Sequence, residues 1–97
     1  MGEGAAAERA GDLPRALAAY RKADALGQPG AAAKGDQTRA LLVVRYTRAA
    51  RDAFTKENLA GAIANWQRVL DLDPNNTTAR SEQARAKALK DKLDNVK

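Results

Sequence analysis

The residue types that most often perform catalysis in proteins are scarce in this chain of 97 residues. It has no histidine and no cysteine, so it lacks the commonest general base, the commonest thiol nucleophile and most transition-metal ligands. Ser81 is the only serine, and no base accompanies it in a recognisable motif. Asp71 and Asp73 flank a leucine where a helix is expected to end, so their carboxylates point in different directions. We therefore expect no catalytic residues and no enzymatic activity.

The sequence also lacks the motifs of cofactor-binding sites and of membrane-spanning segments. The glycines form neither a phosphate-binding loop nor a dinucleotide fingerprint, and the absence of cysteine excludes disulfides and thiolate metal sites. No apolar run approaches the roughly 20 residues of a membrane-spanning helix, and nothing resembles a secretory signal. We expect no cofactor, no metal and no membrane span. The start of the chain leads directly into a helical pattern, so we expect a piece of a longer protein, and the compartment stays open.

The charge of the chain is positive but scattered. The formal net charge is +5, and the surplus of Lys and Arg lies in the last two-thirds of the sequence, interleaved with acids. A nucleic-acid interface gathers its basic residues on one face and adds stacking aromatics. The pattern here is typical of a solvated surface of mixed charge, so nucleic acid is not the expected partner.

The clearest structural signal lies in residues 56–76, which predict a turn, one amphipathic helix and a stop. Asn58 has the side chain of a helix N-cap, and Pro74 cannot continue a helix. Between them the apolar residues recur at helical spacing and predict one buried stripe. These residues are Ile63, Trp66, Val69 and Leu70.

An earlier stretch, residues 11–29, repeats the same order of residue types. In both stretches a leucine, an alanine, an aromatic residue, a small apolar residue and a second leucine follow one another in this order. The matching pairs are Leu13 and Leu59, Ala16 and Ala62, Tyr20 and Trp66, Ala23 and Val69, and Leu26 and Leu72. The doubled pattern resembles the tetratricopeptide repeat, whose second helix carries an alanine, an aromatic four residues later and a closing proline. The resemblance covers most of the chain and names a scaffold, not a partner.

The resemblance implies antiparallel helix hairpins in which small alanines let helices approach and aromatics fill the gaps between them. A tryptophan can also be a binding hot spot, but the family pattern favours core packing for both matched rings and for Tyr46. The implied packing residues are Leu13, Ala16, Tyr20, Ala23, Tyr46, Ala62, Ile63, Trp66, Leu70 and Pro74.

Composition agrees with a small all-α domain of about five helices. Hydrophobic residues make up 44% of the chain, largely alanine, and β-branched runs are nearly absent. We predict one domain over residues 1–97. It divides into a truncated first repeat (1–29), a linker (30–35), a second repeat with an extended first helix starting at Asp36 (36–76), and a polar capping helix (77–97).

The spacing of the two copies departs from the family. The matched alanines Ala16 and Ala62 are 46 positions apart, whereas the usual repeat is about 34 residues long. The excess falls before Val43, in a linker and a longer third helix. Residues 41–44 are apolar on nearly every side of that helix, so we expect a second copy of the chain, or a missing helix, to cover them. A homodimer is therefore one expected state.

In the tetratricopeptide family the first helices of the hairpins line a peptide groove. Laid on this sequence, two arginines stand at equivalent places in adjacent helices, Arg51 and Arg85. Two guanidinium groups can hold a carboxylate, such as a peptide C-terminus or an acidic side chain, and such clamping is known in part of the family. The implied groove residues are Val44, Thr47, Arg51, Phe54, Thr55, Thr78, Ser81 and Arg85.

The sequence thus favours a non-enzymatic scaffold that presents a short groove to a peptide or to a partner subunit. The alternative is a structural or oligomerisation module that pairs through the long third helix. The identity of the partner is not encoded in these residues.

Overall fold

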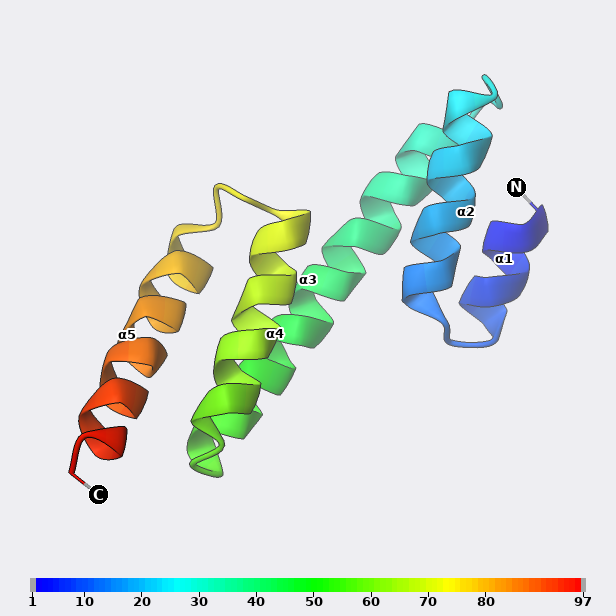
Figure 1. Cartoon of the computed structure of the whole chain (residues 1–97). Helices are drawn as coiled ribbons and strands as arrows, with labels where there is room; N and C mark the ends of the chain where they lie inside the picture. Colours follow the sequence, from blue (N-terminus) through cyan, green and yellow to red (C-terminus); the bar gives the residue numbers. More distant parts are fainter. Residues whose placement is uncertain (1, 97) are drawn as a thin grey trace. The chain divides into compact units, whose positions relative to one another are not determined.

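The computed structural model describes residues 2–96 of the chain. Its helices are α1 (Gly2–Arg9), α2 (Leu13–Ala25), α3 (Ala31–Thr55), α4 (Leu59–Leu72) and α5 (Thr77–Asp94) (Figure 1). The described residues contain no strand, so the predicted all-α class with about five helices is confirmed.

The helices pack as two compact units, and the boundary between them lies inside α3, between Leu42 and Val43. The first unit contains α1, α2 and the beginning of α3, and the second contains the remainder of α3 with α4 and α5. The boundary falls inside segment 36–76, which the sequence assigned to a single repeat. Each unit has its own small core.

Side-chain caps fix where α2, α4 and α5 begin. In each case an Asp or Asn side-chain oxygen accepts a hydrogen bond from the backbone N–H three residues later, which satisfies a donor that the first turn leaves unpaired. The caps are Asp12, Asn58 and Asn76, with N···O distances of 3.2, 3.0 and 2.9 Å. The cap at Asn58, which the sequence analysis predicts, is confirmed.

The third helix begins at Ala31, five residues before the predicted start at Asp36, so most of the predicted linker 30–35 is helical. The physical reason is a stripe of small residues that a search for large apolar side chains overlooks. Alanine is the best helix former, and the buried positions recur at spacings of four, three and four residues. They are Ala31, Gly35, Thr38 and Leu42.

Tyr20 is the centre of the first unit. Its side chain is 1% exposed and packs with Ala7 and Ala16, while its hydroxyl donates to the Glu8 carboxylate at 2.9 Å. Burial raises the pKa of Tyr20 above its ordinary value, and the hydrogen bond to Glu8 raises it further. Helices α1 and α2 lie antiparallel (Figure 1), and Gly4 of α1 faces the ring without a side chain.

Trp66 has the corresponding place in the second unit, where it is 2% exposed. Its indole lies in a core formed by residues of α3, α4 and α5, so the same cluster holds three helices in contact. The buried members are Ala50, Trp66, Val69 and Ala79, and the partly buried residues Val43, Tyr46 and Leu70 pack against them.

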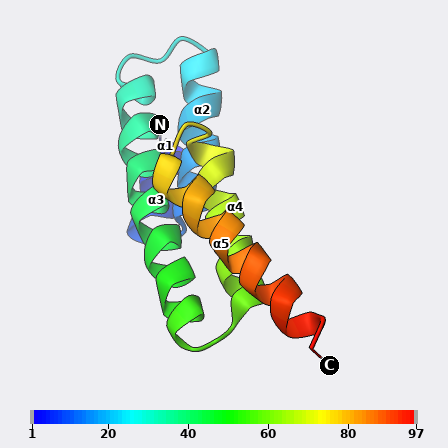
Figure 2. The same cartoon turned by 90° about the vertical axis from the view of Figure 1, so that its left-hand side faces the viewer.

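A buried amide adds a polar link between α4 and α5, which lie side by side (Figure 2). Gln83 of α5 is 7% exposed. Its Nε2 donates to Oε1 of Gln67 at 3.0 Å and to the backbone carbonyl of Ile63 at 3.3 Å. Because a buried amide without partners would be costly, these bonds favour one position of α5 against α4.

Helices α1, α2 and α3 end with the same backbone geometry. In each, one residue adopts a left-handed conformation and donates its N–H three residues back, while the next N–H reaches five residues back. The left-handed residues are Gly11 (φ 78°), Gly27 (φ 80°) and Glu57 (φ 63°). The first two are glycines, for which this conformation carries no steric penalty. At Glu57 the Cβ atom makes the same conformation unfavourable by about 1–2 kcal/mol.

Gly4→Ala is expected to destabilise the first unit although alanine favours helices. A Cβ atom at this position would lie 2.5 Å from Cε1 of the buried Tyr20 ring. Overpacking of this kind costs about 1–3 kcal/mol, which exceeds the gain of about 0.5–1 kcal/mol from replacing a helical glycine. Thermal unfolding followed by circular dichroism measures the difference. The matched control is Gly2→Ala, whose Cβ meets open space; a Gly4→Ala protein as stable as that control would contradict the packing.

Glu57→Gly is expected to raise the free energy of unfolding by about 0.5–1 kcal/mol, because glycine adopts the left-handed conformation without the Cβ penalty but loses more chain entropy on folding. Chemical denaturation of both proteins measures the change. Glu57→Ala separates conformation from charge, since it removes the carboxylate and keeps the Cβ atom. Equal stabilisation by alanine and glycine would refute the conformational explanation.

Candidate functional site

The end of α3 and the first half of α5 line a hollow of about 250 Å³ in the second unit. Two arginines face it, one from each helix, together with an aromatic ring beneath each of them. The lining residues are Arg51, Phe54, Thr55, Trp66, Glu82 and Arg85.

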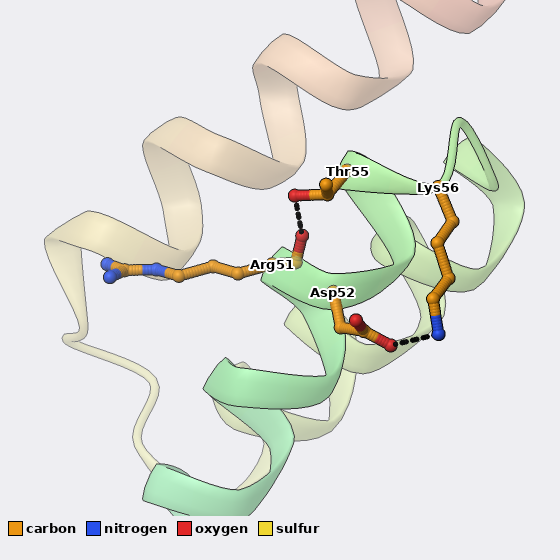
Figure 3. Close-up of polar contacts among 4 residues, drawn as sticks. All are labelled: Arg51, Asp52, Thr55 and Lys56. Atoms are coloured by element: carbon orange, nitrogen blue, oxygen red, sulfur yellow. Dashed lines mark hydrogen bonds and ion pairs between the residues drawn. The ribbon is translucent and has the colours of Figure 1, made fainter.

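The side chain of Arg51 extends from α3 toward α5 (Figure 3). Asp52 and Lys56 lie on another side of α3, where Nζ of Lys56 pairs with the Asp52 carboxylate at 3.0 Å (Figure 3). Thr55 donates its hydroxyl to the Arg51 carbonyl at 3.0 Å, a bond within the helix. Asp52, the acid next to Arg51 in the sequence, is therefore occupied by a lysine and does not neutralise the guanidinium.

Both arginines of the hollow lie over aromatic rings. The Cζ atom of Arg51 is 6.0 Å from the centre of the Trp66 ring, and that of Arg85 is 5.6 Å from the centre of the Phe54 ring. Such cation–π contacts are worth about 0.5–1 kcal/mol at exposed sites. They hold the planar groups near the hollow without consuming their N–H donors, which stay available to a carboxylate.

The hollow carries an excess of positive charge. Its one acid, Glu82, lies 3.9 Å from Nη1 of Arg85, and both side chains are substantially exposed, at 37% and 69% respectively. An exposed pair at this distance contributes little and competes weakly with a ligand. Two cationic side chains therefore face one anionic side chain, and the hollow attracts negative groups.

Two further hollows adjoin this one through shared residues. One, of about 330 Å³, is lined by Val43, Val44, Thr47, Arg48 and Arg51 and therefore shares Arg51. The other, of about 660 Å³, is lined by Phe54, Thr55, Glu57, Leu59, Leu89 and Leu93 and shares Phe54 and Thr55. The three form a row along the C-terminal part of α3, which we call the α3 face.

Six of the eight predicted groove residues line this face: Val44, Thr47, Arg51, Phe54, Thr55 and Arg85. The other two, Thr78 and Ser81, are exposed on α5 and line none of the three hollows. The sequence did not assign Glu57, Leu59, Leu89 and Leu93 to the face. The four-residue spacing of Leu89 and Leu93 was a usable signal, but segment 77–97 was interpreted only as a polar capping helix.

The predicted packing residues occupy three environments. Leu13, Ala16, Tyr20, Ala23, Ala62 and Trp66 are buried, Tyr46, Ile63 and Leu70 are half-buried, and Pro74 is exposed. The exposed fractions of the paired alanines, Ala16 and Ala62, are both 0%. Each lies one helical turn from its ring, so the two copies place the same residue types in the same environment.

Comparison with protein-family models, with curated proteins and with solved structures found no significant match. Within residues 2–96, no three His, Cys, Asp or Glu side chains gather in a way that could hold a metal ion. In the same range no helix combines the length and the apolar character needed to cross a membrane.

Proposed function

We propose that this chain is a non-enzymatic interaction scaffold of the tetratricopeptide type, whose α3 face binds an acidic peptide segment. The observation that carries the proposal is the pair of guanidinium groups, Arg51 and Arg85, which come from two helices and face one hollow. Each is supported by an aromatic ring and neither is neutralised by a close ion pair.

Support for the scaffold comes from the two matched alanine–aromatic pairs. Ala16 and Tyr20 are buried in one unit, and Ala62 and Trp66 in the other, with exposed fractions between 0% and 2%. An alanine one turn from a buried ring allows close helix packing at two places in the chain. This is the packing rule that the tetratricopeptide pattern implies, and it suits a protein that displays helix surfaces.

Support for the ligand class comes from the chemistry of the face. A guanidinium presents N–H donors in a planar fork that matches the two oxygens of a carboxylate. Arg48 adds a third positive charge at the neighbouring hollow, so the whole face favours acidic partners. Because the row of hollows is short, a single peptide makes few contacts and the affinity is expected to be weak.

Replacing both arginines, Arg51→Ala with Arg85→Ala, is expected to weaken binding of a short acidic peptide with a free C-terminus by about tenfold or more. A charge-assisted hydrogen bond contributes about 1.5–3 kcal/mol, and each 1.4 kcal/mol is a factor of ten in affinity. Trp66 is the only tryptophan and lies under Arg51, so its fluorescence reports the binding.

The control for this experiment is Arg68→Ala. Arg68 lies 5.7 Å from the centre of the Tyr46 ring, so it makes a similar stack, but it lines none of the three hollows. Its loss should leave peptide affinity unchanged. The melting temperatures of both variants should stay near that of the parent, since exposed stacks contribute little. Undiminished binding by the double variant would remove the proposal.

A second candidate, self-association through α3, is favoured by one observation. Val44 is 56% exposed and lines the 330 Å³ hollow beside Val43, and the described residues that line this hollow all come from α3. If two copies pair there, light scattering should give the mass of a dimer for the parent and of a monomer for Val44→Lys. A monomeric parent at high concentration would exclude this candidate.

A further inference from the structure

The hollow of about 250 Å³ between α3 and α5, which we call the arginine hollow, lies in a region with an excess of two positive charges. Arg51 and Arg85 line the hollow itself, and Glu82 is the only acid among the described residues that line it. Arg48 lines the adjoining 330 Å³ hollow together with Arg51. Residues three apart lie on the same side of a helix, so Arg48 adds its charge beside Arg51. Three cations thus stand against one anion, whereas a single carboxylate brings one negative charge.

The two guanidinium groups of the arginine hollow reach it from different supports. Arg51 comes from α3 and lies 6.0 Å from the centre of the Trp66 ring, and Arg85 comes from α5 and lies 5.6 Å from the centre of the Phe54 ring. Each group presents its donors as a planar fork. A carboxylate has two oxygens in one plane, which a single fork already satisfies. A phosphomonoester has three terminal oxygens that point in different directions, so forks from two helices can both bind it.

The surroundings confine an anion to the arginine hollow. Its volume lies below the range of about 300–1,000 Å³ that drug-sized ligands occupy, so it suits one small group. The neighbouring 660 Å³ hollow, which we call the apolar hollow, includes the exposed leucines Leu89 and Leu93 in its lining. Glu57 is the only charged residue among the described residues that line the apolar hollow. Its carboxylate repels a second anion there, so the site favours a single, doubly charged group.

A nucleic-acid strand fits this arrangement poorly. Proteins that bind single strands offer aromatic faces on which the bases stack, beside a continuous positive groove. Here Trp66 is 2% exposed, Phe54 is half-buried, and each ring lies beneath a guanidinium group. Glu82 and Glu57 also interrupt the row of positive charge. A phosphoryl group carried by a protein segment is therefore the better match.

We infer that the arginine hollow recognises a phosphorylated serine or threonine side chain of a partner protein, held between the guanidinium groups of Arg51 and Arg85. This inference rests on the proposed function and narrows the acidic segment to one that carries a phosphomonoester. Such a group has a charge of about −1.5 to −2 at neutral pH and three strong acceptor oxygens. It therefore matches both the charge excess and the two forks, and phosphorylation of the partner switches its binding on.

The test compares three peptides that share one acidic sequence and differ at one central position, which is phosphoserine, glutamate or serine. All three end in an amide, so no terminal carboxylate contributes to binding. Binding to the full chain is followed by calorimetry and by Trp66 fluorescence. The phosphoserine peptide should bind about tenfold or more tightly than the glutamate peptide, because one additional charge-assisted hydrogen bond is enough for that factor.

A double variant, Arg51→Lys with Arg85→Lys, assigns the preference to the two planar forks. Both positive charges remain, but lysine binds an anion as a point charge. The preference for phosphoserine over glutamate should be lost, while the affinity for the glutamate peptide changes little. The control is Arg68→Lys, which lies 5.7 Å from the centre of the Tyr46 ring and lines none of the three hollows. It should keep the full preference.

The possible failures are distinguishable. Equal binding of the phosphoserine and glutamate peptides, lost in the Arg51→Ala and Arg85→Ala double variant, would overturn the phosphoryl assignment and leave the proposed function standing. A preference that survives the double lysine variant would place the phosphoryl group elsewhere and overturn the inference. Inorganic phosphate or a single-stranded oligonucleotide that binds as tightly as the phosphopeptide would overturn the partner class. Absence of binding by every peptide would remove both proposals.

Discussion

The burial of Trp66 is the constraint on which the second unit depends. Its indole shares one core cluster with residues of α3, α4 and α5, and a core with so little other aromatic surface has few alternative ways to bury comparable area. Two small residues of the same cluster, Ala50 and Ala79, let the helix axes come close. The same ring carries the Arg51 guanidinium on its margin. Packing and charge placement are therefore two consequences of one side chain.

Arginine suits this arrangement better than lysine. A guanidinium is planar and weakly hydrated, so it lies on a ring and still directs N–H groups outward, whereas an ammonium is a strongly hydrated point charge on a flexible stem. Arg51 and Arg85 each use a ring in this way, and both rings belong to the wall of the same hollow. Held in place, the two cations lose less side-chain entropy when an anion arrives.

The positions of most helices were predicted from the sequence more accurately than the residues that line the surface hollows. Caps at Asp12, Asn58 and Asn76 are local hydrogen bonds between residues three apart, so a short motif is enough to recognise them. The first turns of α3 were missed because Ala31 and Gly35 have no large side chain to signal a buried stripe. The apolar hollow was missed because it depends on how open the C-terminal half of α5 is, which no periodicity records.

Residues that line the α3 face stand next in the sequence to residues of the core beneath it. Ala50 is fully buried and Arg51, the next residue, faces the hollow; on α5 the buried Ala86 follows Arg85. A helix turns by about 100° per residue, so the neighbour of a buried position stands at the rim of the packed surface. Any rotation of α3 or α5 that repacked the alanines would also move the guanidinium groups. The separation of the two charges is thus fixed by the same close helix contacts that stabilise the unit, and the face is as well defined as the core that supports it.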